Sequence, residues 1–132
     1  MSLMNRLGNA RNPYQTNTKR VLCVCSAGLL RSPTAANVLH REYGFNTRSA
    51  GYSQEYALVP VDEVLLAWAD EIVCVEPSVE KGVMNFVTNH TKLDPDFIRE
   101  NITTLNIPDQ YPWGAVELQE AILQQYQEKS KA

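Results

Sequence analysis

An apolar run that passes through a short connection into a helix is the feature that most constrains this chain. Residues 20–25 are almost entirely apolar, as expected of a central strand in a parallel sheet. A helix is predicted over 32–43, because Ser32 suits its N-cap, Pro33 its first position, and Gly44 its end. A strand that feeds a helix so directly predicts the first unit of an α/β fold.

The same alternation of strand and helix continues to the end of the chain. Further strands are predicted over 47–50, 71–75 and 102–107, and helices over 60–69, 77–90, 94–100 and 113–128. In the second and last helices, apolar residues at helical spacing predict that Val64 and Val116 face inward. The pattern predicts an open parallel sheet with helices on both faces, formed by one domain over 20–132 after a flexible leader over 1–19.

Charge and composition narrow the function classes. The 132 residues carry a net charge of -3, so a basic stripe for nucleic acid is missing. No apolar run approaches the roughly 18 residues that span a membrane, and the leader lacks the apolar core of a signal peptide. We therefore expect a cytoplasmic protein with neither nucleic-acid nor membrane partners. Three cysteines without framework spacing argue against a disulfide-stapled fold.

The connection after the first strand combines a thiol, small residues and an arginine. Cys25 opens it, and Arg31 closes it at the start of the helix. Backbone N–H groups in such a loop, together with the helix N-terminus, favour an anion. Gly28 suits the turn because it tolerates positive φ. The residues expected to line this cradle are Ser26, Ala27, Gly28, Leu29, Leu30 and Ser32.

These residues suit transfer of a phosphoryl group onto sulfur. The helix N-terminus and Arg31 favour the thiolate of Cys25, which is the nucleophilic form. Arg31 is predicted to grip two phosphate oxygens with its planar fork. Ser32 is predicted to donate a hydrogen bond to the Cys25 sulfur and so ease its departure. The opposing interpretation, that Cys25 is a small core residue, fits its loop context less well; Cys23 and Cys74, inside apolar strands, fit it better.

A departing alkoxide or phenoxide needs a proton, and Asp109 is the preferred general acid. It follows a strand end, at the sheet edge where the Cys25 loop lies. Asp94, ahead of a predicted helix, is the rival, and a plain turn role for Asp109 stays open. Tyr111 and Trp113 are predicted to wall the site for a flat substrate, or alternatively to seal the last helix against the sheet.

The stretch from Val21 to Cys25, followed by Arg31-Ser32-Pro33-Thr34-Ala35, resembles the low-molecular-weight protein tyrosine phosphatase family. Weaker similarities occur at 49–51, 69–77 and 107–111. The resemblance implies a flavodoxin-like, three-layer α/β/α fold with a four-stranded parallel sheet. It implies a metal-independent phosphocysteine mechanism, without cofactor, on phosphotyrosine proteins or small aryl phosphates. It assigns the nucleophile to Cys25, the phosphate clamp to Arg31, loop support to Ser32 and Ser49, and the general acid to Asp109.

The chain also departs from the family pattern. Ala27-Gly28 replaces the usual Gly-Asn, which removes an asparagine that braces the loop, and Leu30 replaces a second cysteine found in many members. The usual aromatic after Gly51 is missing from its expected place, and Tyr52 or Tyr56 is a potential substitute.

Three other functions remain open on the sequence. An arsenate reductase needs further cysteines on a mobile segment, whereas the only later one, Cys74, lies within a predicted strand. A phosphocarrier has no need of Arg31 or a general acid. A non-catalytic phosphotyrosine-binding module is compatible with the loop, although the presence of Cys25, Arg31 and Asp109 favours an enzyme.

Overall fold

A four-stranded parallel sheet forms the middle of the molecule. The computed structural model describes residues 18–26, 31–54, 57, 59–108, 110 and 115–130. The predicted leader, apart from residues 18 and 19, lies outside them. The elements in chain order are β1 (Arg20–Cys25), α2 (Arg31–Tyr43), β2 (Asn46–Gly51), α3 (Glu63–Trp68), β3 (Glu71–Cys74), α4 (Pro77–His90), α5 (Pro95–Glu100), β4 (Ile102–Thr104) and α6 (Val116–Ser130).

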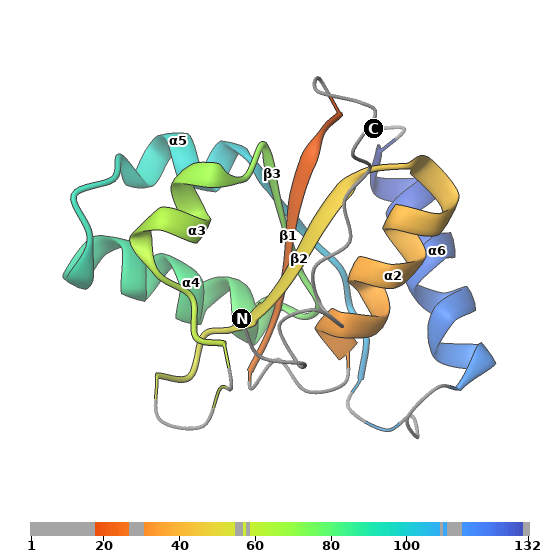
Figure 1. Cartoon of the computed structure of the whole chain (residues 1–132). Coiled ribbons are helices and arrows are strands. Elements are labelled where there is room, and N and C mark those ends of the chain that lie inside the picture. The colour runs from red at the N-terminus through yellow and green to blue at the C-terminus, as the bar shows by residue number, and fades with distance from the viewer. Residues whose placement is uncertain are drawn as a thin grey trace.

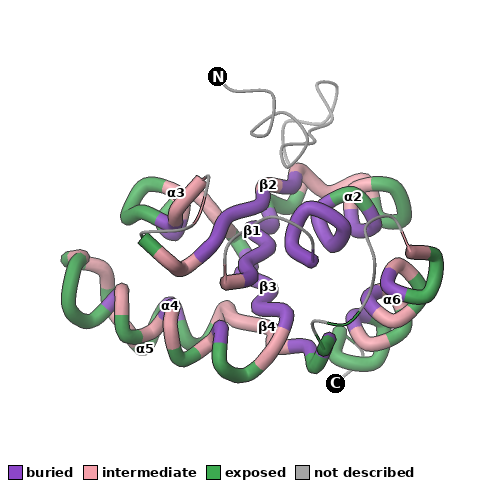
Figure 2. The backbone as a smooth tube through the Cα atoms, turned by 90° about the horizontal axis from the view of Figure 1, so that it is seen from below, coloured by how far each residue is buried: buried purple, intermediate pink, exposed green. Residues whose placement is uncertain are grey.

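Helices cover both faces of the sheet, which confirms the predicted three-layer α/β/α architecture. The strand order is β2-β1-β3-β4, with every pair parallel. Helices α2 and α6 lie on one face, and α3, α4 and α5 lie on the other (Figures 1 and 2). The chain therefore leaves β1 and β3 toward opposite faces, which makes their carboxyl ends the switch point where open α/β sheets bind ligands.

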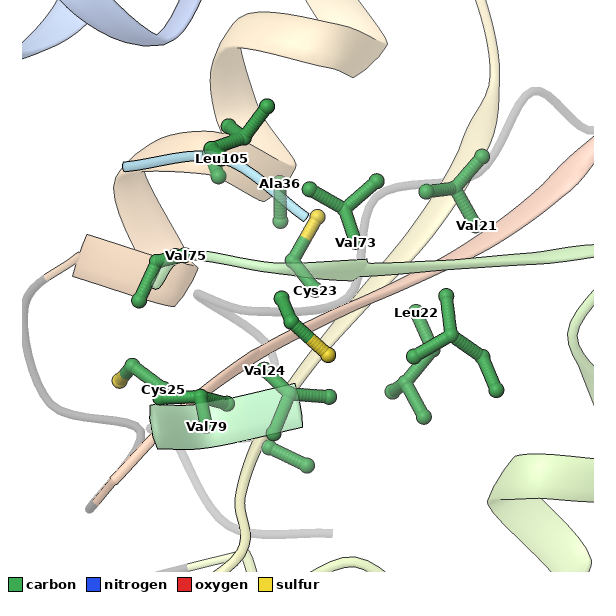
Figure 3. Packing of buried hydrophobic residues seen from close by; sticks show 14 of the residues in the cluster. Val21, Leu22, Cys23, Val24, Cys25, Ala36, Val73, Val75, Val79 and Leu105 are labelled. Carbon is green, nitrogen blue, oxygen red and sulfur yellow. The ribbon is translucent and has the colours of Figure 1, made fainter. Parts of the chain in front are cut away.

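The core follows the central strands. Residues 21–25 of β1 are all buried, because helices cover both faces of this strand. Figure 3 shows part of this packing, from Val21 toward Cys25, where the strand ends. On α6, the buried side chains are Leu118, Ile122 and Tyr126, spaced four residues apart on one side of the helix. Among the described residues, no helix is both long and apolar enough to cross a membrane.

A buried polar contact fixes α6 against the sheet. The Tyr126 hydroxyl donates to Glu71 Oε1 at 2.7 Å, and the same carboxylate accepts from the Thr103 hydroxyl and pairs with Lys19 Nζ at 2.9 Å. Burial, followed by the hydrogen bond to Glu71 and its charge, raises the pKa of Tyr126, so this hydroxyl stays protonated and keeps donating. The position of α6 along the sheet is therefore set by a specific contact as well as by apolar packing.

Several predicted boundaries shift. The predicted helix over 60–69 is only α3, because Asp62 caps it by accepting from the Leu65 N–H, while Pro60 forms an isolated bridge to Gly51. Val64 is 73% exposed, so its predicted inward orientation is wrong: the short helix buries Leu66 instead. Val116 is 62% exposed, also against prediction. It precedes Leu118 by two residues, about 200° around the helix, and so lies away from the buried face.

The ends of α2 and of the last strand can also be compared with their predictions. Gly44 ends α2 as predicted, with φ of 72° and its N–H bonded to the His40 carbonyl. The last strand was predicted over 102–107, but the observed strand β4 ends at Thr104. The prediction is therefore wrong for residues 105–107, which are not regular strand. The chain beyond nonetheless stays attached to β3, as described below.

Gly82 on α4 is required by the ring of Tyr52. A Cβ atom at this position would lie 2.5 Å from Cδ2 of that ring. Gly82→Ala would gain about 1 kcal/mol of helix propensity, but the overlap with an aromatic ring is expected to outweigh it, with a net loss of about 1–2 kcal/mol. Thermal unfolding measures the effect. In a Tyr52→Ala background the same change is expected to be neutral or stabilising, and an equal loss there would contradict this explanation.

Candidate active site

The proposed nucleophile lies where the central strand ends. Cys25 is the last residue of β1 and is 3% exposed. Its carbonyl accepts from the Tyr52 N–H at 3.0 Å, and the Ser26 carbonyl accepts from the Ser53 N–H at 2.9 Å. The first residues of the loop are thus tied to the chain that leaves β2. Residues 27–30 of the predicted anion cradle lie outside the described residues.

A chain of hydroxyl groups leads away from the Cys25 sulfur. Ser32 Oγ lies 3.1 Å from Cys25 Sγ and 2.9 Å from Ser49 Oγ, and it also contacts the Ala50 carbonyl at 3.4 Å. Ser32 and Ser49 are buried, so these hydrogen bonds are shielded from water. The structure therefore brings Cys25 together with the two serines, Ser32 and Ser49, to which the family resemblance assigned loop support. The predicted N-cap role of Ser32 is wrong: α2 begins at Arg31, and the Ser32 hydroxyl turns to the sulfur and to Ser49.

Arg31 opens α2 beside this network and is 4% exposed. Its Nη1 atom donates to the Ile107 carbonyl at 2.9 Å and pairs with Glu76 Oε2 at 3.0 Å. Glu76 lies two residues past the end of β3, and Ile107 lies three residues past the end of β4, so the guanidinium is held between two segments that leave neighbouring strands. A buried guanidinium needs such partners, and two of them also fix the plane of its fork.

Glu76 stays ionised across the physiological range. Burial, the largest single influence, would raise the pKa of this carboxyl. Hydrogen bonds from Ser78 and Arg31, with the positive charge of Arg31, outweigh it and hold the pKa below its usual value. The pair contributes stability above the usual pKa of a glutamate, and loses it only as the pH falls through the lowered value. Sequence reasoning gave Glu76 no role; its one signal was a charge directly after a buried strand.

The other two thiols are buried within the sheet, as predicted. Burial, with a smaller effect of Glu71, raises the pKa of Cys23, and burial with the nearby charge of Glu80 raises the pKa of Cys74. Both sulfurs are therefore protonated, and both residues are fully buried. Cys74, within β3, is poorly placed to relay a disulfide, which weakens the arsenate reductase alternative.

Of the two acid candidates, only Asp94 belongs to the described residues. Asp94 caps α5 by accepting from the Asp96 N–H at 3.0 Å, and α5 lies at the end of the sheet opposite to the Cys25 end of β1 (Figure 1). Asp109 lies outside the described residues, as do Tyr111, Trp113 and Tyr56. Tyr52, the other candidate aromatic wall, packs its ring on Gly82 of α4. Within the described part of the chain, no three His, Cys, Asp or Glu side chains gather as they would around a metal ion.

Comparison with solved structures identifies the fold as that of low-molecular-weight phosphatases. The tyrosine phosphatase Wzb from Escherichia coli K30 in complex with phosphate superposes with a TM-score of 0.55 at 19% identity, over 86% of this chain and 94% of that one. Vibrio vulnificus Wzb in complex with benzylphosphonate gives 0.53 at 21% identity, over 87% and 94%. The YwlE arginine phosphatase from Geobacillus stearothermophilus gives 0.56 at 18% identity, over 86% and 93%. No protein-family model and no curated protein sequence matches the chain.

Proposed function

We propose that this chain is a cysteine-dependent phosphatase that hydrolyses phosphotyrosine or related aryl phosphate monoesters. The observation that carries the proposal is the grouping of Cys25, Ser32 and Arg31 at the switch point of the sheet. There a sulfur lies 3.1 Å from a buried hydroxyl, beside a guanidinium oriented by a carboxylate and a carbonyl. A core cysteine without such a function needs none of these groups. The fold shared with Wzb, a tyrosine phosphatase, adds support.

The reaction takes two balanced steps on these residues. In the first, the Cys25 thiolate attacks phosphorus, a P–S bond forms, the P–O bond to the leaving group breaks, and Asp109 donates the proton that this oxygen needs. In the second, Asp109 takes a proton from water, the water oxygen attacks phosphorus, and the thiolate leaves with phosphate as product. Ser32 stabilises the departing sulfur by a hydrogen bond. Arg31 binds phosphoryl oxygens and stabilises charge in both steps.

In this proposal Asp109 is the general acid because it lies close in the sequence to a residue that contacts Arg31. It follows Ile107 by two residues, and the Ile107 carbonyl is bonded to Arg31. Asp94, by contrast, is engaged as a helix cap at the far end of the sheet. Aromatic walls from Tyr111 and Trp113 stay predictions, as does loop binding of phosphate by 26–30.

The test is hydrolysis of p-nitrophenyl phosphate, with mass spectrometry of acid-quenched enzyme to find a phosphoryl group on Cys25. Phosphotyrosine peptides are compared with phosphoarginine, since the similar structures include both kinds of phosphatase. Turnover of aryl phosphates with phosphate on Cys25 supports the proposal. Tight phosphate binding without turnover favours the binding module, and a preference for phosphoarginine overturns the substrate class.

Asp109→Asn is expected to lower kcat/KM for phenyl phosphate, which reports the step in which the leaving group departs, by about 10²-fold, the usual contribution of a positioned acid. The loss of kcat/KM with p-nitrophenyl phosphate is expected to be smaller, because its leaving group departs without much help from a proton. Asp94→Asn is the matched control and is expected to keep wild-type kcat/KM on both substrates. If Asp94→Asn shows the leaving-group-dependent loss instead, the acid has been assigned to the wrong residue.

A further inference from the structure

The segment that follows β4 stays hydrogen-bonded to β3 and to the residue after it, and so extends the edge of the sheet. The Leu105 N–H donates to the Cys74 carbonyl and the Ile107 N–H to the Val75 carbonyl, both at 2.8 Å. Leu105 and Ile107 are buried, whereas Asn106 between them is exposed. This alternation of buried and exposed residues is that of a β-strand, although residues 105–107 are not paired as a regular strand. The backbone of Asn106 points away from β3, where an edge strand has no neighbour.

The side chain of Gln125 takes the place of that missing neighbour. Its Oε1 accepts from the Asn106 N–H at 2.7 Å, and its Nε2 donates to the Asn106 carbonyl at 3.1 Å. One primary amide therefore satisfies both backbone polar groups of a single residue, as a paired strand would. The two bonds fix the peptide planes on either side of Asn106.

Packing of α6 directs Gln125 to this position. It adjoins Tyr126, whose hydroxyl is bonded to Glu71 on the sheet, and it follows the buried Ile122 by three residues on the same side of the helix. Gln124, its other neighbour, is exposed and donates only weakly to Glu128 within α6, at 3.4 Å. The two adjacent glutamines thus differ in what they contact, although they match in chemistry.

The clamped residue adjoins the carbonyl that orients Arg31. The Ile107 carbonyl accepts from Arg31 Nη1 at 2.9 Å, and the same nitrogen pairs with Glu76 Oε2 at 3.0 Å. We propose that Gln125 is a positioning residue for Arg31: by clamping Asn106 it holds the Ile107 carbonyl, and that carbonyl sets the plane of the guanidinium. This role rests on the proposed phosphatase function. Gln125 acts on Arg31 only indirectly, through its hydrogen bonds to Asn106, the chain from Asn106 to Ile107, and the hydrogen bond from Arg31 to the Ile107 carbonyl.

A double-mutant cycle tests the proposal with p-nitrophenyl phosphate. Gln125→Ala is expected to lower kcat/KM roughly tenfold in the wild-type background, as small misplacements of a catalytic group do. In an Arg31→Lys background the same change is expected to have less than about a twofold effect, because no fork remains to be oriented. Gln125→Glu keeps the acceptor for the Asn106 N–H and loses the donor, so its loss is expected to be intermediate. Gln124→Ala, the matched control, is expected to retain wild-type activity.

The outcomes separate the two proposals. If wild type turns over and Cys25→Ser does not, the phosphatase function stands, and the cycle then decides the role of Gln125 alone. Equal losses from Gln125→Ala in both backgrounds, or no loss in either, overturn the positioning role. Melting temperatures of all variants accompany the kinetics. If Gln125→Ala does not fold, Gln125→Glu completes the cycle, and the same additivity criterion applies to it.

Discussion

Replacement of Cys25 by serine is expected to abolish turnover of p-nitrophenyl phosphate, with a loss of about 10⁴-fold or more in kcat, because a serine hydroxyl is a far weaker nucleophile than a thiolate. The two side chains are nearly equal in shape, and the position is 3% exposed beside Ser32. The fold and the phosphate cradle should therefore persist. Phosphate is expected still to raise the melting temperature of the variant, since binding to the folded state alone stabilises it.

Cys23→Ala provides the control for this prediction. Cys23 lies two residues earlier on the same strand and is fully buried. Its loss should lower stability through a small cavity but leave kcat within a few-fold of wild type. The measurements are initial rates, mass spectrometry of the quenched enzyme, and thermal unfolding with and without phosphate. Full activity of Cys25→Ser, or loss of activity in Cys23→Ala instead, would place the nucleophile elsewhere.

The sequence was sufficient to predict the unit that carries the nucleophile. An apolar run of strand length, a short loop and Pro33 near the start of a helix are local signals, and they placed β1 and α2 within one residue of their bounds. Parallel strands bring their carboxyl ends to one edge, which agrees with the shared role in loop support that the resemblance assigned to Ser32 and Ser49. Their direct hydrogen bond depends on side-chain packing, which only the structure supplies.

The residues that contact Arg31 could not be predicted from the sequence. Glu76 lies 45 residues away and Ile107 lies 76 away, and no local pattern encodes which carboxylate or which backbone carbonyl meets a buried guanidinium. Gln125 was missed for a related reason. A helical wheel places it beside the buried face of α6, but the position of the helix along the sheet is set by distant contacts such as that of Tyr126 with Glu71. The predictions for Val64 and Val116 failed likewise: α3 buries Leu66 instead of Val64, and Val116 lies about 200° around α6 from the buried Leu118.

Arg31→Lys is expected to lower kcat/KM for p-nitrophenyl phosphate by about 10²- to 10³-fold, because one oriented charge-stabilising group is worth roughly that much. A lysine ammonium is a compact donor on a flexible stem. It cannot keep the partners Glu76 and Ile107 while presenting a planar fork to two phosphoryl oxygens. Arg31→Ala should lose more, and should also lose stability, since it leaves the Glu76 carboxylate half-buried beside an unpaired carbonyl.

Arg41→Lys is the matched control, because Arg41 lies on the same helix, is exposed, and contacts Gln119 on α6 and its exposed neighbour Glu42 rather than the groups around Cys25. It is expected to keep wild-type kcat and KM. The comparison separates geometry from charge, since both changes conserve one positive charge on α2. If Arg31→Lys were as active as Arg41→Lys, a point charge would be enough at the site. The orientation of the fork by Glu76 and Ile107 would then contribute to folding alone, and the role given to Gln125 would lose its basis.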